Sequence, residues 1–449
     1  MRRPLLALSL VLCVGSLGLT GTAEAAPRQR VVVMGPGDAS AAIRHAGGTV
    51  ERVLPRLHGA VAQLPVGARL PGFVVSPDRA LTPSGRPERG RGRPVPDEAP
   101  ADAGAGVTVA VVDTGVADVP ELAGRVTHVD VTGDGVGDGY GHGTFVAGLV
   151  AGSTVGAAPA ADVLDVRVGH DDGSTSLADV LAGLEVVAAH PEVRVVNLSL
   201  SSGSPVEVDP LTMALDQLWD AGVVVVVPAG NEGPGRGTVT SPGTDPLLLT
   251  VGGLDTAGTE DRGDDTVAAW SGQGGRGLRN PDLVAPGAHV VSAGAPGSVV
   301  WTANPAAQVG DDLFVGSGSS FSAALVSGAA AAVLASRPAL TPDRVKALLD
   351  LTAYDVAGPR RATGAGALDL GQALASRAPR AGQPAHEGDD PTWDASSWAA
   401  SSWAARQWAA RQWSANAWAA RQWSASSWAA RQWSASSWAA RQWSAVAWE

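Results

Sequence analysis

Between residues 107 and 376, short apolar runs of strand length alternate with longer stretches of helical periodicity. The runs that we expect to form strands are VTVAVVD, ADVLDVRV, VRVVNLSLS, GVVVVVPAG, LLLTVGG and LVAPGAHVVS. The expected helices cover residues 142–152, 176–190, 209–221, 320–336 and 342–353. Uninterrupted apolar runs of this kind are typical of strands buried on both faces. The pattern therefore predicts the α/β class, with a mainly parallel sheet and helices on both of its faces.

A second, shorter pattern precedes this one, between residues 30 and 80. It consists of a strand, a helix and three further strands: VVVM, DASAAIRHAGG, TVERVL, GAVAQLP and FVVSPDRA. This order of elements predicts a small α+β unit, which we place within residues 26–82.

The first 25 residues have the features of a secretory signal peptide. Arg2 and Arg3 precede the apolar run PLLALSLVLCVGSLGL, and Ala23 and Ala25 form an A-x-A cleavage pattern. A membrane anchor is the alternative, but the run is short and ends in small residues, which favours cleavage. We therefore expect a secreted, extracellular protein. Cys13, the one cysteine of the chain, lies inside this segment, so the mature protein has neither disulfides nor a cysteine nucleophile.

The remaining organisation follows from shifts in composition. Residues 83–106 are rich in proline, glycine and charged residues, which predicts an exposed linker. The larger domain then occupies residues 107–380, and a separate tail occupies residues 381–449. The formal net charge of −12 argues against a nucleic-acid partner.

The tail has a repeat of its own. A tryptophan recurs every five residues from Trp393 to Trp448, twelve in all, in units such as WAARQWSASS. Five residues advance about 140° around a helix and change the face of a strand, so neither element gathers these rings on one side. Two interpretations stay open: a low-complexity, disordered tail, or a module that binds the cell envelope or a polymer.

Residues 130–141, DVTGDGVGDGYG, resemble a calcium-binding loop in composition. However, Thr132 stands at the third position and Gly141 at the twelfth, where an EF-hand has an acidic or amide residue and a glutamate. That ligand set is therefore absent. We interpret Asp134 and Asp138 as a solvated rim and expect no metal ion at this loop.

The strongest candidate for chemistry is Ser320, in FVGSGSSFSAALVSG. Gly316 and Gly318 allow a sharp turn before it, and an apolar helix follows that we expect to be buried. At a helix N-terminus, free N–H groups and the helix dipole stabilise the negative charge of an acyl-transfer intermediate. Such a turn is more often a simple helix cap, so the assignment depends on partners elsewhere in the chain.

Three such partners are present upstream. Asp113 ends the run VTVAVVD, at the carboxyl end of a buried strand, where functional groups collect. His142 lies between two glycines in GHGTFVAG. The order Asp, His, Ser is that of the subtilisin arrangement, in which His142 accepts the proton of Ser320 and Asp113 fixes the imidazole tautomer. The side-chain amide of Asn231, in PAGNEG, can donate to the developing oxyanion.

At four motifs the chain resembles the subtilisin-like serine proteases, or subtilases: VAVVDTGV, GHGTFVAG, PAGNEG and GSGSSFSAALVSGAA. The resemblance extends roughly from Val107 to Ser376. The chain departs from the family at Ser319, where threonine is usual, and at Ala324, where proline is usual, and neither position transfers a proton. The resemblance implies an endopeptidase that acts on polypeptides. It also implies that residues 26–82 form a propeptide that assists folding and then blocks the cleft.

The resemblance assigns six residues to substrate binding: Ser199, Leu200, Ser201, Ala229, Gly230 and Thr240. Residues 200–203, after Ser199, correspond to a strand that pairs with an extended peptide, with residues 172–175 at the opposite edge. Ala229 and Gly230 wall the P1 pocket, and Thr240 lies at its base. Glu232, at the mouth, is the one charged residue of these segments, so the resemblance implies apolar P1 residues of medium size.

Two further expectations depend on the resemblance alone. The segment GSTVGAAPAADV, after the helix of His142, is shorter than the calcium-binding insertion of many subtilases. That calcium site is therefore expected to be absent, and a structural calcium ion elsewhere stays open. The Ser241–Pro242 bond aligns with a cis proline of related proteases, so we expect it to be cis.

Together these features predict a secreted, propeptide-bearing serine endopeptidase with Asp113, His142, Ser320 and Asn231 as its catalytic residues. The alternative is a catalytically weak protein of the same fold that acts at a cell surface or on a polymer through its tail. Covalent labelling of Ser320 by a fluorophosphonate separates the two. An esterase on the same triad is a third alternative, tested by comparing peptides with esters.

Overall fold

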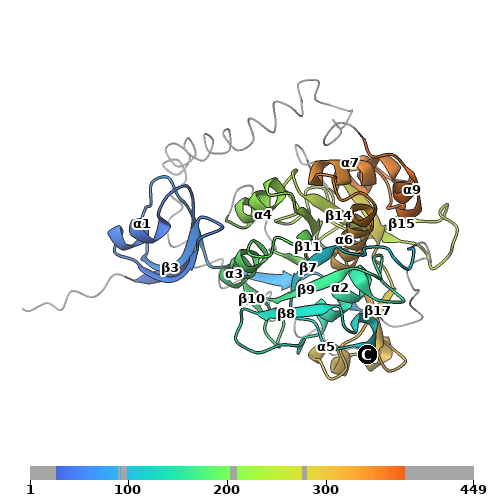
Figure 1. Cartoon of the computed structure of the whole chain (residues 1–449), viewed down its shortest axis with the longest axis horizontal. Helices are drawn as coiled ribbons and strands as arrows, with labels where there is room; N and C mark the ends of the chain where they lie inside the picture. The colour runs from blue at the N-terminus through green and yellow to red at the C-terminus, as the bar shows by residue number, and fades with distance from the viewer. Residues whose placement is uncertain (1–26, 89–91, 93–98, 203–209, 276–280, 380–449) are drawn as a thin grey trace, which may run out of the picture.

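The computed structural model describes residues 27–88, 92, 99–202, 210–275 and 281–379. A small N-terminal domain lies beside a larger domain, and an extended strand leads from one to the other (Figure 1). The expected signal peptide and the tryptophan-rich tail lie outside the described residues.

The larger domain is built around a sheet of order β15-β14-β13-β11-β7-β9-β8, with β16 paired to β14. Every pair is parallel except β14 with β15, which confirms the prediction of a mainly parallel sheet. The central strands are valine-rich and buried on both faces, as their uninterrupted apolar runs predict. The strands are β7 (Thr108–Asp113), β8 (Val126–Asp130), β9 (Asp162–Arg167), β11 (Val193–Leu198), β13 (Val224–Pro228), β14 (Leu249–Asp255), β15 (Thr266–Val267) and β16 (Leu283–Pro286).

Helices cover both faces of this sheet (Figure 1). On one face, α6 packs on β11, β13 and β14, and α2 lies beside α6. On the other face, α3 packs on β7 and β9, and α4 packs on β13. The helices are α2 (His142–Ala151), α3 (Leu177–Val187), α4 (Pro210–Asp220), α5 (Val299–Ala303), α6 (Ser319–Ser336), α7 (Pro342–Thr352), α8 (Arg360–Thr363) and α9 (Leu370–Ala375), with 3₁₀ turns at Pro120–Leu122 and Pro305–Ala307.

Helix α6 is the central helix of the fold. It is apolar nearly all round and buried from Ser319 to Leu334, as its sequence predicts. By length and composition it is the one helix among the described residues that could cross a membrane, but 89% of its apolar window is buried inside the protein. Burial against the sheet accounts for its composition.

The N-terminal domain is an antiparallel sheet of order β2-β3-β1-β4 with one helix on it. Because side chains alternate along β1, Val31 and Val33 pack toward α1, while Val32 and Met34 join the apolar core of the larger domain. The opposite face of the sheet therefore rests on α3 and α4. The elements are β1 (Arg28–Met34), α1 (Ala39–His45), β2 (Thr49–Leu54), β3 (Gly59–Pro65) and β4 (Val74–Pro77).

Residues 80–87 take a different place from the one that composition predicts. Strand β5 (Ala80–Pro83) lies between β10 (Thr175–Ser176) and β12 (Leu200–Ser201) in a three-stranded antiparallel sheet. Strand β6 (Arg86–Pro87) pairs with β19 (Leu313–Ser317), which also pairs with β17 (Val290–Ala293) and β18 (Gln308–Val309). The start of the predicted exposed linker is thus strand-paired, because proline suits an extended bound segment as well as a free linker.

Candidate active site

Asp113 and His142 meet at the carboxyl edge of the main sheet. Asp113 is the last residue of β7, and His142 is the first residue of α2, after Gly141, whose positive φ of 108° makes the turn. The two side chains are buried, and His142 Nδ1 lies 2.7 Å from Asp113 Oδ1. Asp113 Oδ1 also accepts the N–H of Thr114 at 2.8 Å. The carboxylate is therefore placed to fix one tautomer of the ring.

Ser320 lies at the first turn of α6, close to this pair. Its Oγ is hydrogen-bonded to the Ser199 carbonyl oxygen at 3.0 Å and to Ser84 Oγ at 2.9 Å. His142 Nε2 is buried and has no hydrogen-bond partner among the described residues. The hydroxyl is thus turned away from the imidazole while residue 84 occupies the site.

Asn231 follows β13, and Ser319 fixes the orientation of its amide. Asn231 Oδ1 accepts the Ser319 backbone N–H at 3.0 Å and the Ser319 hydroxyl at 2.9 Å. The amide Nδ2 consequently points the other way and donates to the Ser84 carbonyl oxygen at 2.5 Å. Ser319 supplies the hydroxyl that threonine would supply, which explains why this departure from the family pattern leaves the contact intact.

Asp138 is part of this site, and its interpretation as a solvated rim is wrong. It is only 8% exposed and accepts four hydrogen bonds. One oxygen accepts Thr114 Oγ1 at 2.9 Å and Gly141 N–H at 2.6 Å, while the other accepts Thr144 N–H at 2.8 Å and Thr144 Oγ1 at 2.7 Å. The pKa of Asp138 is raised above its ordinary value, because the effect of burial exceeds the opposing effect of these hydrogen bonds.

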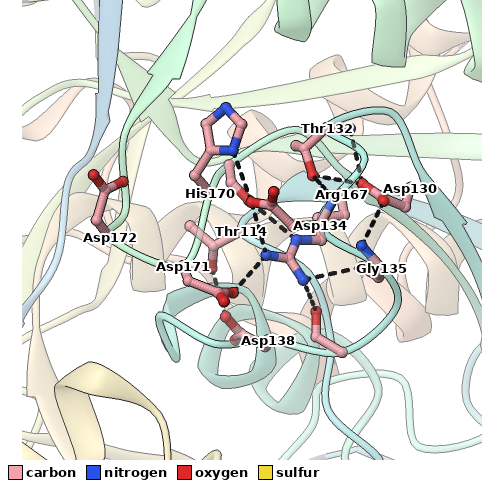
Figure 2. Close-up of polar contacts among 12 residues, drawn as sticks. Thr114, Asp130, Thr132, Asp134, Gly135, Asp138, Arg167, His170, Asp171 and Asp172 are labelled. Carbon is pink, nitrogen blue, oxygen red and sulfur yellow. Dashed lines mark hydrogen bonds and ion pairs between the residues drawn. The ribbon is translucent and has the colours of Figure 1, made fainter.

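The contacts of Asp138 replace a missing helix cap. Gly141, the residue before α2, has no side chain, so the carboxylate four residues before His142 accepts the N–H groups of Gly141 and of Thr144 in the first turn. The same carboxylate holds Thr114, the neighbour of Asp113 (Figure 2). An acidic residue in the turn before an apolar helix is a capping signal, and it could have been recognised in the sequence.

A guanidinium group holds the rest of the loop 130–141 in place (Figure 2). Arg167, at the end of β9, is buried, and its Nη2 lies 2.6 Å from Asp171 Oδ1 and 3.5 Å from Asp134 Oδ2. Its Nη1 donates to the carbonyl oxygens of Gly135 and Gly137 at 3.0 and 3.3 Å. Within the described ranges, no group of three or more His, Cys, Asp and Glu residues could hold a metal ion.

The residues assigned to substrate binding gather around β5. Leu200 and Ser201 pair with Pro83 and Thr82, and Thr175, on the opposite side, pairs with Leu81. The antiparallel pairing on both sides places β5 as an added strand between the two edges.

The expected P1 pocket lies next to these strands. Ala229, Gly230 and Thr240 are buried there, and a Cβ added to Gly230 would lie 2.5 Å from Thr240 Oγ1. Thr240 therefore packs directly against the glycine wall. The Ser241–Pro242 bond is cis, as expected.

Comparison with known proteins agrees with this geometry. The Subtilase family matches residues 104–366, and the chain belongs to that family. It is 38% identical over 268 residues to the serine protease AprX of Bacillus subtilis, covering 55% of this chain and 61% of AprX. It is 34% identical over 259 residues to subtilisin Savinase of Lederbergia lenta, covering 56% of this chain and 84% of Savinase.

A solved structure shares the fold. Fervidolysin from Fervidobacterium pennivorans, described as a keratinolytic enzyme related to subtilisin, superposes with a TM-score of 0.64 at 23% identity. The match covers 79% of this chain and 62% of fervidolysin. At this identity the likeness concerns the fold alone, and it includes more of the chain than the subtilase match does.

Proposed function

We propose that this protein is a serine endopeptidase with Asp113, His142 and Ser320 as its triad and Asn231 as its oxyanion donor. The observation that carries the proposal is the 2.7 Å hydrogen bond between buried Asp113 and His142, with Ser320 and Asn231 in the same site. Membership of the subtilase family and similarity to AprX and Savinase support it.

The arrangement of these four residues suits acyl transfer, because each of them can perform one part of the reaction. Ser320 turns from the Ser199 carbonyl to the unpartnered Nε2 of His142, which takes its proton as the oxygen attacks a peptide carbonyl. Asn231 Nδ2 donates to the oxyanion, a contact made useful mainly in the transition state. Asp113 stabilises the imidazolium that forms. The ring then protonates the leaving amine.

Residues 26–82 serve in this proposal as an inhibitory propeptide. The sheet of the N-terminal domain buries apolar side chains against α3 and α4. Polar contacts fix its position: Glu185 accepts the N–H groups of Arg56 and Leu57 at 3.1 Å, and Asp78 accepts the N–H of Ala178 in the first turn of α3 at 2.9 Å. Because β5 is paired between β10 and β12, this N-terminal segment blocks access to the site.

The proposal also includes export from the cell and attachment at the cell surface. Residues 1–25 provide the features of a cleavable secretory signal, and the tryptophan repeat of residues 381–449 provides aromatic and basic groups for an envelope or polymer surface. Amino-terminal sequencing of protein recovered from the culture medium tests the export step.

A fluorophosphonate tests the catalytic assignment. Once the N-terminal domain has left the site, the protein should become labelled on Ser320, and Ser320→Ala should lose both labelling and turnover, with a rate loss on the order of 10⁶. Ser336→Ala, at the other end of α6, is the matched control and should keep both. A folded protein that neither reacts with the probe nor cleaves peptides would favour the surface-binding alternative.

A further inference from the structure

Two strands of the chain pair with the larger domain on either side of Ser320, and two residues lie between them. On one side, Pro83 pairs with Leu200 through β5 and β12. On the other side, Arg86 pairs with Ser317 through β6 and β19. The segment that connects β5 to β6 is Ser84–Gly85. The chain is thus held in an extended form across the site.

The carbonyl group of Ser84 lies where the carbonyl group of a substrate would lie before attack by Ser320. Its oxygen accepts the Asn231 Nδ2 hydrogen bond at 2.5 Å. A Cβ on Gly318 would clash with the same oxygen, so the turn before α6 also closes around it. Ser320 Oγ lies 2.9 Å from Ser84 Oγ, which places the nucleophile at the same residue.

Gly85 lies on the imidazole side of the bond. A Cβ added to Gly85 would lie 3.1 Å from His142 Nε2 and would overlap the ring of Phe321. A larger residue at this position must displace the Phe321 ring and crowds the catalytic imidazole. The leaving group of the cleavage, the backbone nitrogen of Gly85, therefore belongs to the residue beside His142, which would donate the proton to it.

We infer that the precursor cleaves its own Ser84–Gly85 bond, and that residues 81–85 define the substrate sequence that the mature enzyme prefers. This inference rests on the proposed function. Ser320 Oγ bonds to the Ser84 carbonyl carbon as its proton passes to His142, and the C–N bond then breaks with that proton leaving on the Gly85 amine. Water next attacks the ester, gives a proton to His142 and returns Ser320 with its proton, leaving a Ser84 carboxylate.

The burial of the bound segment defines the preferred sequence. Leu81, three residues before Ser84, is only 1% exposed, while the Thr82 side chain faces solvent. Ser84 itself is buried and is bonded to Asn231, and Thr240 packs against Gly230, the residue before Asn231. The enzyme should therefore select leucine at P4, a small residue at P1 and glycine at P1′. This differs from the medium-sized apolar P1 residue that the family resemblance implies.

Purified full-length precursor provides the direct test. Incubation should yield a new N-terminus at Gly85 and an N-terminal fragment ending at Ser84, identified by sequencing and intact mass. Because the bond lies in its own active site, the rate should not change with protein concentration. Ser320→Ala should stay uncut, which excludes a contaminating protease.

Gly85→Val should slow cleavage at this bond on the order of 100-fold, because the new side chain displaces Phe321 and crowds His142. Ala41→Val, at an exposed position of α1, adds similar bulk in the same domain and should cleave at the normal rate. The peptide of residues 80–88, ALTPSGRPE, gives an independent readout with matured enzyme: it should be cut between Ser84 and Gly85, and its Gly85→Val form should resist.

The outcomes separate this inference from the proposed function. Cleavage at a different bond, with Ser320 still labelled by the fluorophosphonate, would overturn the inference and leave the protease assignment intact. Equal cleavage of the ALTPSGRPE peptide and of its Gly85→Val form would do the same. Absence of labelling, of peptide hydrolysis and of precursor cleavage together would remove the proposed function itself.

Discussion

Asp138 accepts a 2.9 Å hydrogen bond from Thr114 Oγ1, and this contact links the two elements that supply Asp113 and His142. Thr114 follows Asp113 at the end of β7, and the other contacts of Asp138 cap the helix that begins at His142. Thr114 Oγ1 in turn accepts the N–H of Gly143 at 2.9 Å. One buried carboxylate therefore sets the distance between strand and helix.

Asp138→Asn should lower kcat by about 10- to 100-fold with little change in KM, because a small displacement of catalytic groups costs up to about 10²-fold. Asparagine keeps the volume, but its NH₂ group must face donors that the carboxylate oxygens accepted, which leaves buried groups unpaired at about 1–3 kcal/mol. Asp134→Asn is the matched control on the same loop, where the side chain is 35% exposed, and it should change kcat less than about 2-fold. A raised KM with normal kcat would assign Asp138 to substrate binding instead.

Asn231→Ala should lower kcat by about 10²–10³ and leave KM nearly unchanged, because its amide donates chiefly to the transition state. Ser319→Ala tests how the amide is oriented. It removes the hydroxyl contact at 2.9 Å but keeps the backbone contact at 3.0 Å, so it should cost roughly one hydrogen bond, about 5-fold in kcat. If Asn231→Ala changed KM alone, the asparagine would be structural.

Much of this arrangement could be predicted from local sequence. The helix expected at residues 142–152 is α2, the one at 320–336 is α6, and both begin within one residue of the expected position. Such elements are readable because apolar periodicity and glycine turns act over a few residues. The apolar run that ends at Asp113 indicated the carboxyl edge of the sheet, where His142 now meets it.

The rest depends on contacts between distant residues. A segment that contains Pro83 and Gly85 can be either a free linker or an extended strand bound to the larger domain. Only the pairing of Pro83 with Leu200 in the folded protein distinguishes these two possibilities. The capping position of Asp138 is local, but its contact with Thr114 forms only when β7 brings that residue to it from 24 positions away. Arg167 likewise finds its loop carbonyls only after β9 has joined the sheet.

The stability of the folded protein should fall as pH rises above neutrality, through the pair of half-buried His128 and buried Asp165. His128 Nδ1 lies 2.8 Å from Asp165 Oδ2, and its Nε2 lies 3.7 Å from Asp118 Oδ1. The hydrogen bond to Asp165 raises the pKa of His128 above its ordinary value of 6.5. Burial raises the pKa of Asp165 to about 6.

A raised histidine pKa stabilises the fold below the unfolded value, and this stabilisation is lost as pH rises through the folded value. The Asp165 contribution has the same sign but is lost at lower pH, between its ordinary value and about 6. Thermal melts of Ser320→Ala precursor, which cannot digest itself, should therefore show a lower Tm at pH 9 than at pH 6. Adding His128→Gln should reduce that difference, and an unchanged difference would show that other groups cause it.

The tail should be dispensable for peptide hydrolysis and needed for retention on a surface. Twelve tryptophans and the five arginines of its RQW units, Arg406, Arg411, Arg421, Arg431 and Arg441, suit both membrane interfaces and stacking on sugar rings. A chain that ends at Ala381 should match the full protein on a soluble peptide. After incubation with cell walls, lipid vesicles and insoluble polysaccharide, the full protein should show the larger bound fraction on at least one of them.

Replacing the five arginines by glutamine distinguishes the two modes of contact. Binding to anionic vesicles should weaken in this variant and should fall further with salt, because each basic group contributes about 1 kcal/mol near such a surface. Binding to an uncharged polysaccharide should persist, since stacking on sugar rings depends on the tryptophans that the variant retains. Equal binding of the full and the shortened chain to every surface would leave the tail without an adhesive role, and the subtilase domain would then act without it.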